Sequence, residues 1–217
     1  MPPTWTILVP TLGERRDLFG RLMTGLLPQL DPYAGRVRVV SWFNNGSPSL
    51  PKIRQAMIDR AETDYVSFVD DDDLVSPDYV AEIVAALQTC PDYVGFQVQC
   101  YSDGAPTAVA HHSLEFTRWR NLPGRFERDI SHINPIRTVL ARRASFARTR
   151  EGGAEDRDWA GQLRRAKILR TQVVVPRIMY HYLFTTAGTR WQKPRAITPG
   201  ERSPITHPYF TWSDDAC

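Results

Sequence analysis

Short apolar runs alternate with amphipathic segments over the first ninety residues of the chain. Each run has the length and the β-branched or aromatic content of a buried strand, and apolar residues recur every three or four positions in the segment that follows it. These strand–helix pairs are predicted at 5–9 and 17–30, at 37–43 and 53–61, and at 65–69 and 76–87. Three successive pairs predict an α/β fold in which a mostly parallel mixed sheet is flanked by helices.

The pattern changes after residue 92. Further strands are predicted over 93–101, as a pair within 108–119 and over 173–178, and further helices over 139–148 and 155–167. From residue 191 onward prolines recur at short intervals, which is typical of a segment outside a packed core. We therefore expect a single domain over 1–190, followed by a proline-rich tail or flap over 191–217.

The composition is that of an ordinary globular domain. The 217 residues suffice for one core but not for two, and 42% hydrophobic with 24% charged residues excludes a disordered tail or a coiled-coil rod. Three cysteines, Cys90, Cys100 and Cys217, lack metal-ligand spacing and favour a reducing compartment. Because there is no signal-peptide pattern and no run of about 18 apolar residues, we expect no membrane span and a cytoplasmic location, or the host cytoplasm for a phage-encoded chain.

The small net charge of +3 hides a strong asymmetry along the chain. Residues 1–117 carry 8 basic and 15 acidic side chains, whereas residues 118–170 carry 14 basic and 6 acidic ones. The basic segment 118–170 holds 13 arginines and one lysine, a composition that suits phosphate oxygens and leaves a nucleic acid partner open.

Four consecutive aspartates, Asp70 to Asp73, follow the predicted strand 65–69 directly. Ligands of α/β sheets bind outside the carboxyl ends of the strands, and adjacent carboxylates repel one another unless a cation neutralises them. This favours a divalent metal site, and strand alternation predicts that Asp70 and Asp72 face one side while Asp71 turns away. The alternative is a solvated acidic loop before a helix N-terminus.

Five segments resemble a known family in their order along the chain. The aspartate run, in Phe-Val-Asp-Asp-Asp-Asp-Leu-Val-Ser-Pro-Asp-Tyr at 68–79, resembles the Asp-x-Asp motif of nucleotide-sugar glycosyltransferases, in particular the inverting family 2. The family's other segments resemble Ile-Leu-Val-Pro-Thr at 7–11, Asn-Asn-Gly-Ser at 44–47 and Ile-Arg-Gln at 53–55. Its base-supplying segment resembles Gly-Gly-Ala-Glu-Asp-Arg-Asp-Trp at 152–159.

This resemblance implies one GT-A-like, Rossmann-like glycosyltransferase domain over 1–190. The half at 1–100 is expected to bind the nucleotide sugar and the metal, and the half at 101–190 to supply the acceptor side and the base. Within the motif, Asp72 is the implied ligand of Mn²⁺ or Mg²⁺, which bridges diphosphate oxygens, and Asp70 approaches the ribose or the water shell of the metal.

Asp156 is the implied general base, which activates an acceptor hydroxyl and inverts the anomeric centre. The residues alone leave an alternative, because Glu155, Asp156 and Asp158 have the placement of ordinary first-turn acids that complement a helix dipole.

The remaining implied donor contacts come from three segments. Thr11 and Arg15 hold the base and ribose, and Asn44 or Asn45 replaces an acidic residue that contacts the nucleobase in relatives. An amide both donates and accepts, so this departure leaves the nucleotide open. Arg54 faces the diphosphate or is an exposed helical arginine.

Three further side chains have two interpretations each. His181 is a metal ligand, as in some relatives, or a structural histidine. Trp159 and Trp191 stack on a sugar on the acceptor side, or pack in the core.

The acceptor is a saccharide or small molecule, or a hydroxymethylated pyrimidine in phage DNA. The Gln-x-x-Arg-Trp motif of membrane-embedded synthases is incomplete, because Ala187 occupies the glutamine position. Two alternatives come from other classes: a phosphatase of the haloacid-dehalogenase type, which also uses Asp-x-Asp after a strand, and a non-catalytic nucleic-acid-binding domain.

Overall fold

A parallel three-stranded core confirms the strand–helix repeat at the start of the chain. The structure, a computed structural model, describes residues 1–149, 154–185 and 210–212. Strand β1 (Trp5–Leu12) lies between β2 (Val37–Asn44) and β3 (Tyr65–Phe68), parallel to both, and all eight of its side chains are buried. The carboxyl ends of the three strands therefore meet at one edge of the sheet.

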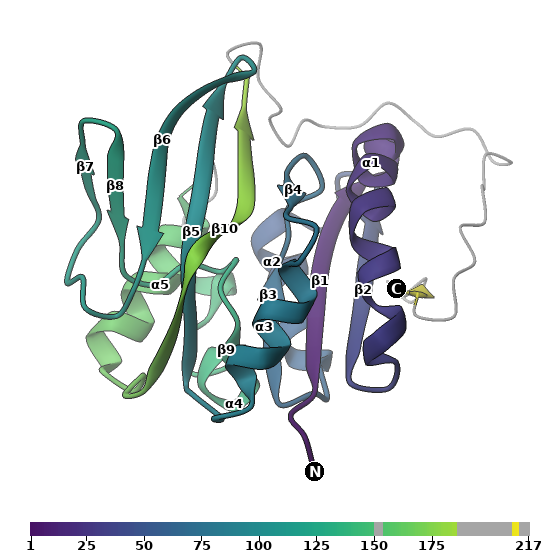
Figure 1. The fold of residues 1–217 in the computed structure, drawn as a ribbon. Coiled ribbons are helices and arrows are strands. Elements are labelled where there is room, and N and C mark those ends of the chain that lie inside the picture. The colour runs from purple at the N-terminus through teal and green to yellow at the C-terminus, as the bar shows by residue number, and fades with distance from the viewer. Residues whose placement is uncertain (150–153, 186–209, 213–217) are drawn as a thin grey trace, which may run out of the picture.

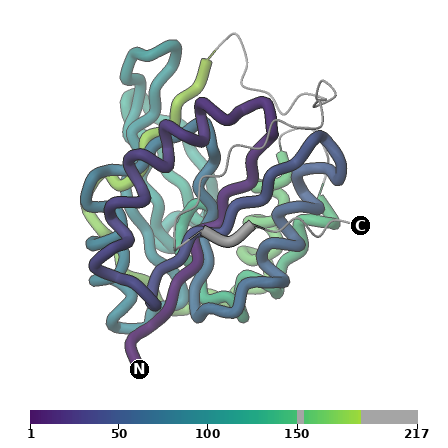
Figure 2. Tube along the Cα trace, turned by 90° about the vertical axis from the view of Figure 1, so that its right-hand side faces the viewer, coloured from purple at the N-terminus to yellow at the C-terminus, as the bar shows by residue number. Residues whose placement is uncertain are grey.

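Helices cover both faces of this sheet, as predicted. Helices α1 (Arg16–Leu26) and α3 (Tyr79–Leu87) pack into one buried apolar cluster, and α2 (Leu50–Arg60), α4 (Thr138–Ala141) and α5 (Glu155–Ala166) pack into the other. In Figure 1, α3 lies in front of the sheet and α2 behind it. The view turned by 90° separates α1 from α2 on opposite sides of the strands (Figure 2). Short 3₁₀ helices lie at Gly13–Arg15, Leu27–Gln29, Asp31–Tyr33 and Phe146–Arg148.

The second half of the chain extends the sheet with mostly antiparallel strands. These are β5 (Tyr93–Ser102), β6 (Ala105–His112), β7 (Arg120–Leu122), β8 (Arg125–Arg128), β9 (Ile136–Arg137) and β10 (Gln172–Phe184), with β4 (Leu74–Val75) joined to β10. Strand β10 runs parallel to β5 and antiparallel to β4. Strand β10 therefore lies beside the segment that directly follows the aspartate run.

The sequence-based boundaries fail at three places in this half. The strand pair predicted within 108–119 is β6 followed by the later hairpin β7–β8. The helix predicted over 139–148 is only α4 and one 3₁₀ turn, because Gln162 and Gln55 side chains accept the backbone N–H groups of Ser145 and Phe146. Strand β10 continues six residues past its predicted end, since its polar positions pair along β5.

The predicted proline-rich tail lies almost wholly outside the described residues. Its described part, β11 (Phe210–Trp212), pairs parallel with β2. Among the helices in the described ranges, none combines the length and apolarity that a bilayer crossing requires.

Candidate active site

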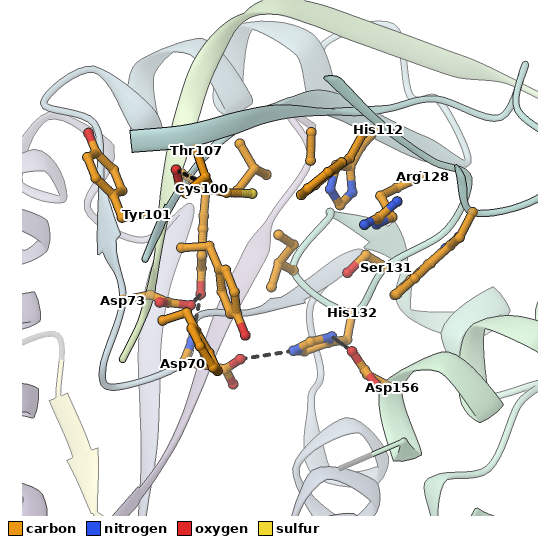
Figure 3. Close-up of a pocket in the computed structure, with 18 of the residues that line it drawn as sticks. Asp70, Asp73, Cys100, Tyr101, Thr107, His112, Arg128, Ser131, His132 and Asp156 are labelled. Carbon is orange, nitrogen blue, oxygen red and sulfur yellow. Dashed lines mark hydrogen bonds and ion pairs between the residues drawn. The ribbon is translucent and has the colours of Figure 1, made fainter. Parts of the chain in front are cut away.

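A cavity of about 480 Å³ opens beside the aspartate run, between the parallel core and the strands of the second half. Asp70 and Asp73 line it from the end of β3, and Arg54, Glu155 and Asp156 line it from α2 and α5. In Figure 3, Asp70, His132 and Asp156 lie in a row along one side of the cavity. The structure thus brings two of the predicted donor residues, Asp70 and Arg54, to the same cavity as the predicted base, Asp156.

The four aspartates do not alternate as predicted. Asp72 shares Arg15 with Asp71, with Nη–Oδ distances of 2.5 Å and 2.9 Å, whereas Asp70 pairs separately with Arg54 at 2.7 Å. The expectation that Asp70 and Asp72 face one side is wrong, because β3 ends at Phe68 and the aspartates form a turn closed by the Asp73 N–H and the Asp70 carbonyl.

Two of these carboxylates are buried, so the solvated-loop alternative is also wrong. Burial raises the pKa of Asp71 to about 7, although Arg15 and the Thr11 hydroxyl, 2.5 Å away, oppose the rise. Burial likewise raises the pKa of Asp73 well above its usual value, against hydrogen bonds from the Tyr180 hydroxyl and the Leu183 N–H. The carboxylates of Asp71 and Asp73 are thus held by contacts inside the protein.

Asp70 behaves differently from its neighbours. Burial alone would raise its pKa, but Arg54 and His132 outweigh this and hold the pKa of Asp70 well below its usual range. Asp70 therefore keeps a negative charge at the cavity wall.

Arg54 is a buried connector, not an exposed helical arginine. Its side chain is 4% exposed, and its guanidinium lies over the rings of Phe68 and Phe146, 5.6 Å and 5.8 Å from their centroids. It donates to Asp70 at 2.7 Å and to Glu155 at 3.1 Å. Despite burial, these carboxylates raise the pKa of Arg54, so its charge is permanent. Arg54 therefore joins the end of β3 to the first residue of α5.

Asp156 reaches the cavity from the first turn of α5. Its side chain is 30% exposed, one carboxylate oxygen accepts the Arg157 N–H at 2.7 Å, and the other lies 3.8 Å from His132 Nδ1. Asp156 is thus a partly exposed carboxylate at the cavity wall, separated from Asp70 by His132.

His132 is the site residue that the sequence analysis missed. Its Nε2 lies 3.3 Å from Asp70 and its carbonyl accepts the Phe68 N–H, which lays the segment before β9 along the end of β3. No local pattern marks this histidine, because the contact joins residues more than sixty positions apart.

The remaining predicted donor residues lie near the ends of β1 and β2. Thr11 and Arg15 contact the aspartate run, Asn44 is buried and donates to the Pro48 carbonyl at 2.9 Å, and Asn45 is exposed. His181 lies on β10, with ring nitrogens 3.3 Å from the Ser76 hydroxyl and 3.4 Å from the Tyr101 hydroxyl. Burial lowers the pKa of His181, so its imidazole is neutral at pH 7.

The two tryptophans assigned to the acceptor side have different outcomes. Trp159 is 1% exposed and stacks on Phe146 with centroids 4.9 Å apart, so its core interpretation holds and its acceptor-side assignment is wrong. Trp191 lies outside the described residues.

Several arginines of the basic segment contact other residues of the protein. Arg120 and Arg125 face Glu127, Arg164 pairs with Asp129, Arg137 pairs with Asp92, and Arg142 donates to carbonyls at the end of α2. Part of the positive charge of this segment is therefore paired with carboxylates or with carbonyls at a helix end.

A Rossmann-like sheet with an aspartate run at its carboxyl edge, facing an acidic helix start across a cavity, is the arrangement of the GT-A fold. Residues 7–149 match the family model described as glycosyl transferase family 2, and the chain belongs to this family. This confirms the resemblance and replaces the phosphatase and the non-catalytic binding domain as interpretations.

Solved structures of S. aureus TarS share the fold. The fragment 1–349 superposes with a TM-score of 0.61 at 16% identity, covering 83% of this chain and 60% of the fragment. Its complex with UDP-GlcNAc gives 0.58 at 18% identity, and its complex with UDP gives 0.56 at 17%, each again over 83% of this chain. The chain thus spans 58% to 60% of these fragments. The search of curated proteins gave no match.

Proposed function

We propose that the protein is a metal-dependent, inverting glycosyltransferase that moves a sugar from a nucleoside diphosphate sugar to an acceptor hydroxyl. The observation that carries this is the pairing of an ionised Asp70 on the donor side with Asp156 across one histidine. The TarS complexes with UDP-GlcNAc and UDP support a nucleotide-sugar donor for a chain of this fold.

The proposed chemistry is a single displacement. Asp156 takes the proton of the acceptor hydroxyl, whose oxygen forms a bond to the anomeric carbon of the donor sugar. The bond from that carbon to the diphosphate breaks on the opposite face, and the diphosphate leaves with the bonding electrons. Attack opposite the leaving group inverts the anomeric centre.

The described residues fit a hard divalent cation supported by the substrate. The Asp72 side chain is 17% exposed and Arg15 holds one of its carboxylate oxygens, Oδ2, which leaves Oδ1 for a cation. Mg²⁺ or Mn²⁺ is often held by one or two carboxylates together with substrate phosphates and water. When bound, the cation would supply Lewis-acid stabilisation to the leaving diphosphate. Within the described ranges no three His, Cys, Asp or Glu side chains lie close enough together to hold a metal ion by themselves. We keep His181 as a proposed metal ligand.

We expect Mn²⁺ together with one nucleoside diphosphate to raise the melting temperature, because the site exists only in the folded state. The measurement is a thermal-shift panel of UDP, GDP, dTDP and CDP, each with and without Mn²⁺. At a ligand concentration 100 times the Kd, the stabilisation is about 2.7 kcal/mol. Asp72→Asn is expected to lose the Mn²⁺-dependent part of the shift. A panel without any shift contradicts the donor site.

Two exposed aromatic side chains in the cavity lining support a proposal for the acceptor class. Tyr182 and Phe184 lie two residues apart on β10, line the cavity and are 46% and 47% exposed. Of the arginines in the described lining, Arg54 is held by two carboxylates, and Arg128 donates within the β7–β8 hairpin while it lies over the Trp119 and Phe126 rings. Exposed aromatic rings beside occupied arginines favour a neutral saccharide or small-molecule acceptor over a phosphate-rich one.

Tyr182→Ala and Phe184→Ala are each expected to raise the acceptor KM about tenfold, since a covered aromatic ring contributes about 1.5 kcal/mol. Val174→Ala is the matched control, because Val174 is exposed on the same strand but is not part of the cavity lining. The acceptor KM should change by less than about twofold between 50 and 200 mM salt, whereas a DNA acceptor would lose about 10³-fold in affinity or more. A steep salt dependence would therefore restore DNA as the acceptor.

A further inference from the structure

His132 lies between the two carboxylates to which the proposed function gives separate tasks. Its Nε2 is 3.3 Å from Asp70 on the donor side, and its Nδ1 is 3.8 Å from Asp156, the proposed base (Figure 3). The first distance is within reach of a hydrogen bond, whereas the second is beyond it. The two sides of the imidazole are therefore held differently.

The imidazole is fixed from the donor side. The His132 carbonyl accepts the Phe68 N–H at 2.9 Å, two residues before Asp70, and the His132 ring packs against the Phe68 ring with centroids 5.9 Å apart. His132 is buried, so its ring has little room to turn away from either carboxylate. Whatever fixes the end of β3 therefore also fixes the direction in which Nδ1 points.

Nδ1 is a buried polar atom without a hydrogen-bond partner among the described residues. Buried polar atoms in folded proteins are almost always paired, so an orphan at a cavity wall indicates a partner that arrives during function. Asp156 is the nearest candidate, because one of its oxygens is already turned toward Nδ1 and the other accepts the Arg157 N–H. A movement of about 1 Å by the Asp156 side chain would complete this hydrogen bond, in which the doubly protonated ring donates from Nδ1 to Asp156 while Nε2 donates to Asp70.

We propose that His132 is a positioning residue that orients the Asp156 carboxylate toward the acceptor hydroxyl, with its own ring held in place by Asp70. The inference rests on the proposed function, because it gives His132 a role only if Asp156 is the base. It adds a residue that ties the geometry of the base to the donor side of the same cavity.

His132→Ala is expected to lower kcat about 100-fold, the effect of misplacing a catalytic group by about 1 Å, while the donor Kd changes less than threefold. Two conservative variants separate the two contacts. Asparagine can place an amide N–H where Nδ1 stands and glutamine can place one where Nε2 stands, so His132→Asn should recover more of kcat than His132→Gln. Greater recovery by glutamine, or an unchanged kcat in His132→Ala, overturns the proposal.

A second readout needs no turnover. In protein labelled with ¹³C at aspartate, the carboxyl resonance of Asp156, assigned by its absence in Asp156→Asn, should move in His132→Ala and return toward its position in His132→Asn. A resonance that does not move overturns the positioning role even if wild-type transfer is normal. Wild-type protein that transfers no sugar overturns the proposed function and the catalytic role of His132 with it, whatever the resonance does. Equal losses of kcat, donor binding and melting temperature in all three variants would show a purely structural histidine.

Discussion

Asp156→Asn is expected to lower kcat by about 10²- to 10⁴-fold while the dissociation constant of the donor nucleotide changes little. The amide keeps the shape of the carboxylate and its hydrogen bond from the Arg157 N–H, but it cannot take a proton from the acceptor hydroxyl. The measurement pairs steady-state transfer rates with nucleotide binding by calorimetry. The loss should appear in kcat and kcat/KM together, since the interaction exists only in the transition state.

Asp158→Asn is the matched control for this experiment. Asp158 lies in the same first turn of α5 and loses the same charge, but it is not among the residues that line the cavity. If Asp156 only complemented the helix dipole, both variants would cost about 0.3–1 kcal/mol of stability and neither would change kcat. Turnover that persists in Asp156→Asn would remove it as the base.

The donor half of the molecule was predictable because its signals are local. Strand 37–43 and helix 53–61 were read from the spacing of apolar residues, and β2 and α2 match them to within three residues at each end. The position of the aspartate run after a buried strand placed it at the carboxyl edge of the sheet, as the structure confirms.

The roles inside the run depend on partners that no local pattern reveals. Arg15 reaches Asp71 and Asp72 from the 3₁₀ turn between β1 and α1, and Tyr180 reaches Asp73 from β10, more than one hundred positions away. Alternation along a strand was the wrong rule, since the run is a turn. Its pairing is set by which cations and hydroxyls the tertiary fold brings to each carboxylate.

His132 and Arg54 show the same limit at the other side of the cavity. Arg54 on α2 contacts Asp70 after β3 and Glu155 at the start of α5, and His132 contacts the same Asp70. These partners are distant in sequence, so local patterns do not reveal the contacts. The net charge of the segment 118–170 likewise did not show which arginines are paired, since Arg120 contacts Glu127 and Arg164 contacts Asp129 within the segment, whereas Arg137 contacts Asp92 outside it.

These contacts make Arg54 the electrostatic link between the donor side and the base. It is the buried cation between Asp70 and Glu155, so one guanidinium compensates carboxylates from two parts of the chain. Removing a single partner from such a cluster leaves carboxylates that neither water nor another cation fully compensates, and this is more costly than never having buried the charges.

Arg54→Met is therefore expected to lower the free energy of unfolding by about 3 kcal/mol at pH 7.5, the lower end for a broken buried pair, since the Asp70 side chain is still 26% exposed. The measurement is urea denaturation of both proteins without metal or nucleotide. A triple variant that adds Asp70→Asn and Glu155→Gln should regain most of the loss, because the orphaned charges are then removed. A triple variant no more stable than Arg54→Met would show that lost packing against Phe68 and Phe146, not charge, causes the effect.

The size of this loss should depend on pH. In the wild-type protein the pKa of Asp70 is held below its ordinary value, so its ion pair stabilises the fold above about pH 4, and the stabilisation is lost as the pH falls through the lowered pKa. In Arg54→Met that cation is absent and only His132 still opposes the effect of burial, so we expect the pKa of Asp70 to rise above its ordinary value and the variant to lose stability as the pH rises. The difference in free energy of unfolding should therefore grow between about pH 4 and pH 7. A difference that stays constant over this range would contradict the electrostatic role of Arg54.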